Sequence, residues 1–390
     1  MENKGPELNN RKELPETEEI NAPGGQTPED EDTKKSINWR GLIIGAVAFV
    51  VIITVTLIFL RFTDEAFRFK ELPIYFKSMN GWYVLLALLC LFAYIVSEGR
   101  AIAASGHGIG IKINYKKSTI YSCVELFFAA LTPSASGGQP AVAYFMSKDG
   151  IKLSKSSVIL LNNTLHYTVS LFVLSTFAMI WKWDFIFAPE RGKYFIWLFI
   201  SGYIANILGL LSCLLFIFAP GLVRTIFTPV YRLLAKMHII KDLDRALASF
   251  EKSVAEYSEC QKTIRRSPGA QIQTFLWNCA QRTLNCLVPF FVYRALGGGK
   301  PMIEILVIQI LILCSVNAIP LPGSVGASEM VHKQLYQTLY SVGSVTPAMI
   351  ITRTFNFYIM VVIVGIVSVA YYIHILKEGR KKSDIERLGS

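Results

Sequence analysis

The sequence lacks the short motifs that mark common enzyme sites. It contains no HExxH metalloprotease motif, no GxSxG nucleophile elbow, no complete Walker motif and no clustered metal ligands. The stretch Gly297–Lys300 has neither the outer glycine spacing nor the Ser/Thr after the lysine that a phosphate loop needs. We therefore predict no catalytic residue, no metal and no cofactor, and no ATP-driven pumping by this chain alone.

The seven cysteines also lack a pairing pattern. None forms a CxxC, and most lie inside apolar runs, so we interpret them as small core residues rather than as disulfides or metal ligands. A cleavable signal peptide is missing as well, because the first apolar run starts only at Gly41 and is long enough to span a membrane.

What the sequence does have is long apolar runs. Hydrophobic residues make up 52% of the 390 positions, and the mean hydropathy is +0.42. This composition predicts a polytopic membrane protein. The net charge of +11 does not indicate a nucleic-acid partner, because the charges lie at the ends of apolar segments, where they anchor and orient a membrane protein.

The predicted fold is an all-α integral membrane protein with six full transmembrane helices and two opposed re-entrant helical hairpins. The predicted full spans are residues 41–60, 81–96, 155–181, 194–219, 270–293 and 347–376. Glu98 and Arg100 are taken to close the second span. The apolar runs inside residues 118–148 and 301–343 are interrupted, and each piece is too short to cross about 30 Å of hydrocarbon. We interpret each pair as a re-entrant hairpin.

Polar segments divide the chain into five parts. Residues 1–38 are acidic and predicted to be a disordered cytoplasmic tail. The first membrane half is 39–219, and 268–376 completes the membrane part. Between them, 220–267 has apolar residues at helical spacing, which predicts one or two cytoplasmic amphipathic helices. These helices lie either on the membrane surface or against the underside of the bundle. Residues 377–390 form a basic cytoplasmic tail.

The distribution of positive charge predicts the orientation. With the N-terminus in the cytoplasm, 27 of the 39 Lys/Arg fall in inner segments and eight in outer segments. The positive-inside rule then places both termini of this multi-pass protein on the cytoplasmic side of the plasma membrane. In this layout the second half repeats the elements of the first upside down, so we predict an inverted repeat. A topology map that places Ser147 and Ser344 on the same face would contradict it.

Two stretches rich in proline and glycine, residues 131–140 and 319–329, interrupt the apolar segments. Proline removes a backbone donor, and broken backbone survives in hydrocarbon only inside protein or beside a watery cavity. Paired interruptions in two halves of a transporter point to its binding site. We predict that both breaks meet near the midplane and that their helix N-termini bind an anion such as a lipid phosphate. The alternative is that their side chains only cap the half-helices. The predicted head-group and translocation residues are Thr132, Ser134, Ser136, Gly137, Gly138, Gln139, Pro320, Pro322, Gly323, Ser324, Gly326, Ser328 and Glu329.

Further polar side chains lie deep in apolar segments, where charges are costly and face a cavity or a partner. The predicted supporting residues are Glu125, Asn162, His166, Arg282, Asn285, Arg353 and Asn356, with Asn278 and Gln281 beside them on the fifth span. Arg282 and Arg353 are candidates to hold phosphate, and Glu125 or Glu329 to meet an amine. A structural ion pair of Glu125 with Arg282 or Arg353 is an equal alternative. We expect His166 to be a hydrogen-bonded core residue rather than a proton relay.

The two breaks carry a family resemblance. The run Thr132–Pro140, followed by Ala143 and Tyr144, resembles the first hairpin signature of the lysylphosphatidylglycerol synthase transmembrane family. The run Pro320–Glu329 is similar to the second signature, P-x-P-G-x-x-G-x-x-E, with Ser324 where many members have glycine. The resemblance covers about residues 40–376, which is essentially the whole membrane part.

This resemblance implies a function. The family includes the membrane half of the multiple peptide resistance factor, which is held to flip aminoacylated phosphatidylglycerol to the outer leaflet and so to confer resistance to cationic antimicrobial peptides. The bifunctional relatives carry a soluble transferase domain after the membrane part, whereas this chain has fourteen residues after Leu376. The resemblance therefore implies a stand-alone flippase-like protein, and a phosphatidylglycerol lysyltransferase activity is not expected of it.

We therefore predict a phospholipid translocase that moves an anionic or aminoacylated phospholipid, such as lysylphosphatidylglycerol, between leaflets. Its expected partners are that membrane phospholipid and a separate lipid synthase, and homo-oligomerisation stays open. Two alternatives remain. The first is a secondary transporter of a small solute or ion, built on the same broken helices. The second is a membrane partner or enzyme in lipid aminoacylation.

Overall fold

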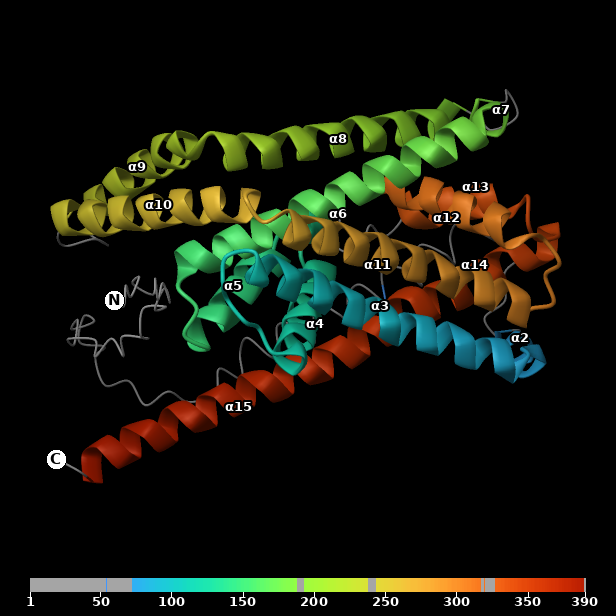
Figure 1. Cartoon of the computed structure of the whole chain (residues 1–390). Helices are drawn as coiled ribbons and strands as arrows, with labels where there is room; N and C mark the ends of the chain where they lie inside the picture. The colour runs from blue at the N-terminus through green and yellow to red at the C-terminus, as the bar shows by residue number, and fades with distance from the viewer. Residues whose placement is uncertain are drawn as a thin grey trace, which may run out of the picture. The chain divides into compact units, whose positions relative to one another are not determined.

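The computed structural model describes residues 72–187, 193–237, 243–316 and 327–388, together with the single positions Thr54 and Ile319. The predicted acidic tail, the first span at 41–60 and the second break from Pro320 to Gly326 lie outside the described residues. Within the described ranges every regular element is helical. The predicted all-α class is thus confirmed for this part of the chain (Figure 1).

Four helical segments are long and apolar enough to cross a membrane. Among the described residues they are Gly81–His107, Leu153–Trp181, Phe195–Phe218 and Val345–Glu378. A further apolar helix, Met302–Val316, is shorter. The protein is therefore a helical membrane protein.

Helix α3 (Gly81–His107) follows the short α2 (Leu72–Ser78) and begins at Asn80, whose side chain accepts a hydrogen bond from the Trp82 backbone N–H. The prediction that this span ends near Val96 is wrong, because the helix continues to His107. Glu98 does not end it, since polar side chains of two other helices bind its carboxylate inside the bundle.

Small residues beyond Glu98 bring the next helix close. A Cβ atom added to Gly99 would lie 2.7 Å from the backbone oxygen of Ser118, which is closer than any real contact allows. Small residues have this use in membrane bundles, where close backbone approach replaces hydrophobic driving force.

The first predicted hairpin consists of two separate helices. Helix α4 (Tyr115–Leu131) and helix α5 (Gly138–Lys148) pack against each other, and the 3-10 turn Pro133–Ala135 lies between them. Ala135 has a φ of 55°, in the left-handed region that an alanine rarely occupies. The predicted helix break around residues 131–140 is thus confirmed.

The next two predicted spans are also helices. Helix α6 (Leu153–Trp181) is joined through the short α7 (Trp183–Ile186) to helix α8 (Lys193–Phe218), which packs back along α6. A hydrogen bond of 2.7 Å links Thr176 Oγ1 and Tyr203 OH. The outward face of α8 exposes large apolar side chains, as a lipid-facing helix requires: Trp197, Ile204, Leu208, Leu211, Leu215 and Phe218.

The amphipathic segment forms two helices, α9 (Pro220–Lys236) and α10 (Leu243–Arg265). Helix α10 packs on α6 and buries Val254, Tyr257 and Ile264. The interpretation of packing against the bundle therefore holds for α10. Helix α9 packs on α10 and α8, yet it exposes Ile226, Phe227, Val230 and Leu233. Contact of α9 with the membrane surface stays a prediction.

Helix α11 (Pro268–Ala295) runs antiparallel along α3, and no other described helix pair packs more extensively. The Asn80 N–H donates to the Ala295 carbonyl at one end, and Ser105 Oγ lies 3.2 Å from Thr274 Oγ1 at the other. Helices α12 (Met302–Val316) and α13 (Ala327–Tyr336) follow and pack against each other as a second hairpin.

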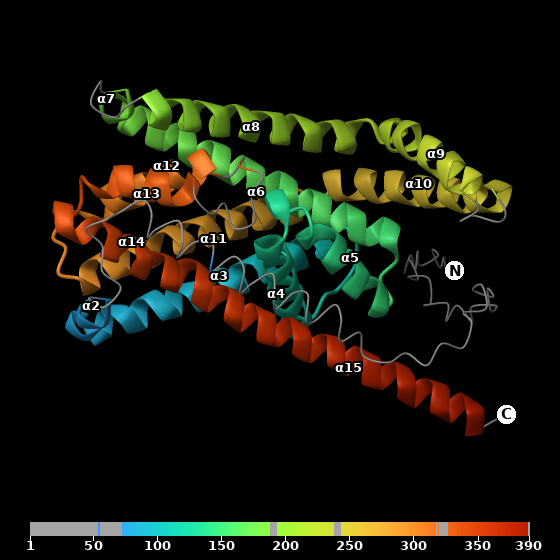
Figure 2. The same ribbon diagram turned by 180° about the vertical axis from the view of Figure 1, so that it is seen from behind.

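The last predicted span is a composite helix. Helix α14 (Val345–Arg353) passes through a π-helical turn, Thr354–Ile359, into α15 (Met360–Leu388). The basic segment from Lys377 is therefore helical as far as Leu388. Helix α15 packs against α4, which crosses it (Figures 1 and 2). The Tyr371 hydroxyl donates to Asp149 Oδ2 at 2.6 Å, which ties α15 to the end of the first hairpin.

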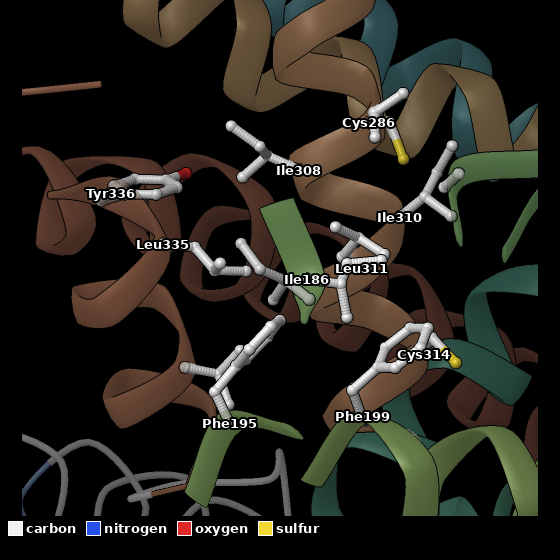
Figure 3. Close-up of a cluster of buried hydrophobic side chains, with 14 of the residues drawn as sticks. Ile186, Phe195, Phe199, Cys286, Ile308, Ile310, Leu311, Cys314, Leu335 and Tyr336 are labelled. Atoms are coloured by element: carbon white, nitrogen blue, oxygen red, sulfur yellow. The ribbon is translucent and has the colours of Figure 1, made fainter. Parts of the chain in front are cut away.

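A hydrophobic cluster fixes the second hairpin against α8 (Figure 3). It joins Phe195 and Phe199 of α8 to Leu311 of α12 and to Leu335 and Tyr336 of α13. All seven cysteines are free thiols, and three of them, Cys123, Cys286 and Cys314, are fully inside such cores. The second hairpin is therefore packed tightly against α8.

Candidate functional site

A cavity of about 190 Å³ lies between α3, α11, the second hairpin and the π-helical turn. One part of its wall is apolar, with Ile312, Leu313 and Val316 of α12. The polar lining residues are Tyr94, Asn285, Gln309, Ser328, His332, Thr352, Arg353 and Asn356. Four of these, Asn285, Ser328, Arg353 and Asn356, were predicted from the sequence, and the structure brings them together.

Arg353 is the charged group at the cavity wall. Its Nε lies 2.9 Å from Glu329 Oε1, and its Nη1 donates to Ser328 Oγ at 2.8 Å. The side chains of Arg353 and Glu329 are 11% and 1% exposed, so the pair is desolvated. The alternative that pairs Arg353 with Glu125 is wrong, because Glu329 lies next to Arg353 and Glu125 belongs to another cluster.

Local structure places these groups. Ser328 and Glu329 are in the first turn of α13, where unpaired N–H groups and the helix dipole favour negative charge. Arg353 ends α14, and Asn356 lies three residues on in the π-helical turn. Such turns are frequent at functional sites. Here the turn leaves both side chains on the cavity wall.

Neutral donors and acceptors surround this ion pair. His332 Nδ1 lies 2.7 Å from the Ser328 carbonyl oxygen, which fixes the ring against its own helix. Gln309 Nε2 donates to Tyr336 OH at 2.7 Å across the second hairpin. The cavity thus combines one guanidinium with several amides and hydroxyls, a set suited to a charged or strongly polar group.

The side chains of the first break form hydrogen bonds within the first hairpin. Thr132 Oγ1 accepts the Gly137 N–H at 2.8 Å and donates to the Phe128 carbonyl. Gln139 Nε2 donates to Glu125 Oε1 at 2.6 Å. A Cβ on Gly138 would lie 2.9 Å from the Glu125 carbonyl oxygen, so only glycine fits there. Ser136 is exposed, and the described cavity lining contains no residue from 132–139.

A second polar cluster lies at the centre of the bundle. Glu98 of α3 accepts hydrogen bonds from Asn163 Nδ2, at 2.7 Å, and from Gln281 Nε2. Asn278 Nδ2 donates to Asn163 Oδ1 at 3.0 Å. Arg282 is 6% exposed, and its Cζ lies 3.4 Å above the centre of the Tyr167 ring. These side chains join α3, α6 and α11.

The remaining predicted residues have structural partners. Asn162 Nδ2 donates to Ser105 Oγ at 3.1 Å. His166 is hydrogen-bonded to Gln271, which is the arrangement expected of a core histidine. Neither side chain lines the described cavity. Within the described residues, the other predicted site residues therefore divide into a cavity group, a central group and a group in the first break.

The cavity group and the central group are neighbours along two helices. Tyr94 lines the cavity, and Glu98 lies one turn further along α3. Asn285 lines the cavity one turn after Arg282 on α11. Residues one turn apart share a helix face. The antiparallel pair of α3 and α11 therefore connects the two groups.

Sequence reasoning missed Tyr94, Gln309, His332 and Thr352 of the cavity group and Glu98, Asn163 and Tyr167 of the central group. One signal was present for Glu98, since the small residues after it indicate close helix packing rather than a loop. His332 follows Ser328 by four residues, which places both on one face of α13. Gln309 is a single amide in an apolar run and gave no signal.

Comparisons with known proteins identify relatives of this chain. A family model described as lysylphosphatidylglycerol synthase TM region matches residues 42–365. A "UPF0104 membrane protein" from Archaeoglobus fulgidus is 21% identical over 297 residues, which cover 74% of this chain and 85% of that protein. Both matches extend over the larger part of the chain, and the family model includes every cavity residue and both predicted breaks.

Proposed function

Because this chain belongs to the lysylphosphatidylglycerol synthase TM region family, we propose that it is a phospholipid translocase. The proposed substrate is an anionic or aminoacylated phospholipid, such as lysylphosphatidylglycerol, which moves between the two leaflets. The observation that carries the proposal is the cavity beside the second hairpin, where Arg353 lies among amides and hydroxyls.

The chemistry of this cavity suits a phosphate-containing head group. A guanidinium donates N–H groups in a planar fork that matches a phosphate, and amide and hydroxyl donors add to it. Polar groups inside a membrane bundle are costly, which argues that these groups face a substrate. In this proposal the head group binds in the cavity while the acyl chains stay in the surrounding lipid.

The arrangement of the two halves supports alternating access. Helix α3 packs on α4 as α11 packs on α12, and α5 packs on α6 as α13 packs on α14. Helices α3 and α11 are antiparallel and adjacent. An inverted repeat requires this pattern of neighbours. The proposal therefore includes six spans, two re-entrant hairpins that enter from opposite faces, and cytoplasmic termini in the plasma membrane.

One observation favours a second candidate function. The cavity volume of about 190 Å³ is small compared with sites for drug-sized ligands, which occupy roughly 300–1,000 Å³. A small solute or ion transporter is consistent with such a volume. The two functions differ in whether acyl chains accompany the head group, and an assay can separate them.

The decisive experiment is a leaflet assay with purified protein in liposomes. Labelled phosphatidylglycerol, or its lysyl form, is placed in both leaflets, and a membrane-impermeant quencher reports the label that reaches the outer leaflet. Wild type is expected to expose the inner-leaflet label, while Arg353→Lys slows exposure because an ammonium has three donors instead of five to share among Glu329, Ser328 and a head group. The matched control is Arg232→Lys, which changes an exposed arginine of α9.

Each outcome separates the candidates. Exchange that depends on Arg353 and not on Arg232 supports lipid translocation through the cavity. If the folded protein exchanges no lipid but takes up a labelled small solute, the lipid proposal is wrong and the transporter replaces it. If lysyl-tRNA is added to the same liposomes and the protein transfers the lysyl group to phosphatidylglycerol with release of free tRNA, the enzyme of lipid aminoacylation replaces both candidates.

A further inference from the structure

The carboxyl group of the buried Glu98 meets that of the half-buried Glu125 where the first hairpin packs on α3. Glu98 of α3 is 3% exposed, and its carboxyl lies within hydrogen-bonding reach of the carboxyl of Glu125 on α4. Amides occupy three of the four oxygens: Asn163 and Gln281 bind Glu98, and Gln139 binds Glu125 Oε1. Glu125 Oε2 is buried and has no N–H or O–H donor in the described part of the chain.

The charges around this pair do not balance two carboxylates. Among the described residues, the cation that acts on the pair is Arg282 of α11, which is 6% exposed and stacks on Tyr167. Tyr94 of α3 also faces the pair, and a phenol is neutral near pH 7. Two ionised carboxylates would exceed the positive charge and repel each other in a poorly solvated site.

We propose that Glu98 and Glu125 form a proton-binding site in which the two carboxyl groups share one proton. A hydrogen bond between two carboxyl groups needs a proton on one of them. That proton supplies the donor that Glu125 otherwise lacks. With one proton bound, the two carboxyl groups and Arg282 together are neutral, as a site inside a membrane bundle requires.

The position of the site allows proton binding to act on the first hairpin. Gln139 in the first turn of α5 donates to Glu125, and Gly138 approaches the Glu125 backbone too closely for any side chain. Tyr94 connects the pair to the cavity. Release of the proton leaves adjacent negative charges on α3 and α4, which weakens the contact of the hairpin with α3.

Proton binding thereby becomes a means of coupling head-group movement to a proton gradient. This coupling rests on the proposed lipid translocation, whereas the proton site itself does not.

Infrared spectroscopy of the purified full chain in lipid nanodiscs tests the proton site directly. At neutral pH, wild type is expected to show the C=O stretching band of a protonated carboxylic acid, which shifts in D₂O. Glu98→Gln and Glu125→Gln are each expected to lose this band, because a single remaining carboxyl ionises beside Arg282. Glu304→Gln is the matched control, since Glu304 is at the start of α12, 3.9 Å from Lys182 and partly exposed. It should keep the band.

The outcomes are distinct. A wild-type spectrum without a protonated-carboxyl band at neutral pH overturns the proposal, and this measurement needs no variant to fold. A band that survives in the double variant Glu98→Gln/Glu125→Gln also overturns it. A band that only one of the two single variants loses would show a proton held by that carboxyl alone, and the sharing would be wrong.

The leaflet assay under a pH gradient tests the coupling. The gradient is expected to change the exchange rate of wild type and of Glu304→Gln, but not that of the two single glutamine variants. Exchange that ignores the gradient in wild type overturns the coupling. If no lipid exchange occurs at all, the proposed function fails, and the infrared result still decides the proton site.

Discussion

The two hairpins present a glutamate to the interior in different surroundings. In the first hairpin, Glu125 meets an amide of α5 and the carboxyl of Glu98. In the second, Glu329 meets the guanidinium of Arg353 at 2.9 Å. The first break is packed closely on its neighbours, whereas the second hairpin borders the cavity. A buried acid is therefore stabilised by amides and a shared proton in one half and by an ion pair in the other.

This difference separates the tasks of the two halves. An ion pair has a fixed charge distribution and can orient a charged ligand, but it costs desolvation energy and fails when one partner is lost. A carboxyl pair with amide donors changes its charge when it gains or loses a proton. The second half is thus the better binding surface, and the first half is the better sensor of protons.

Removal of Arg353 should give the largest effect. Arg353→Met leaves Glu329, which is 1% exposed, without its guanidinium, and breaking a buried pair costs roughly 3–5 kcal/mol. We expect a corresponding loss in unfolding free energy, measured by chemical denaturation in detergent micelles. Arg232→Met is the control, because Arg232 is exposed on α9. Equal stability of the two variants would show that the pair is solvated and that the contrast between the hairpins is wrong.

Gly138→Ala should give the next largest effect, in the first half. The added Cβ would lie 2.9 Å from the Glu125 carbonyl oxygen, which is backbone and cannot yield easily. Overpacking of this kind costs about 1–3 kcal/mol. Gly343→Ala is the matched control, because a Cβ there meets nothing within 4 Å. The thermal unfolding midpoint should fall for the first variant only, and equal midpoints would show that α5 can move away from α4 without cost.

The substitution Asp149→Asn should give the smallest effect on stability. Asp149 lies at the end of the first hairpin, outside the spans. Burial raises the pKa of Asp149, but hydrogen bonds from Lys117, Tyr121 and Tyr371 outweigh it, so the net pKa is lowered. Because the pKa of Asp149 is lower in the folded state than in the unfolded state, its carboxylate stabilises the fold at any pH above the unfolded-state pKa. This stabilisation is lost as the pH falls through the folded-state pKa.

Wild type should therefore lose stability below about pH 4, and Asp149→Asn, already less stable at neutral pH, should lose less over the same range. Thermal unfolding measured across this range checks the prediction. The same acid-induced loss in both proteins would assign the pH dependence to other carboxylates.

The long helices and the first break were predictable because their causes are local. Apolar runs such as 155–181 and 194–219 are long enough to specify their own helices, and Pro133 and Gly137 interrupt the chain wherever it folds. The extent of α3 was not predictable in this way. Whether Glu98 ends a helix or continues it depends on Asn163 and Gln281, which are distant in sequence.

The site was predictable in part for the same reason. Arg353 and Asn356 are conspicuous as polar residues in an apolar span, and the structure places both at the cavity. Their partners were not conspicuous. The choice of Glu329 over Glu125 as the partner of Arg353 depends on how the second hairpin packs on α14, and a sequence pattern does not contain that packing.

The π-helical turn Thr354–Ile359 sets how helix α15 is rotated about its own axis relative to helix α14. Each residue of an α-helix advances the chain by about 100°, since a turn holds 3.6 residues. A wider turn interrupts this advance, so the helix beyond it is rotated relative to the phase that α14 began. The π-helical turn therefore determines which face of α15 contacts α4 and brings Tyr371 to Asp149. The same six residues therefore decide both which side chains face the cavity and which side chains of α15 face the first hairpin.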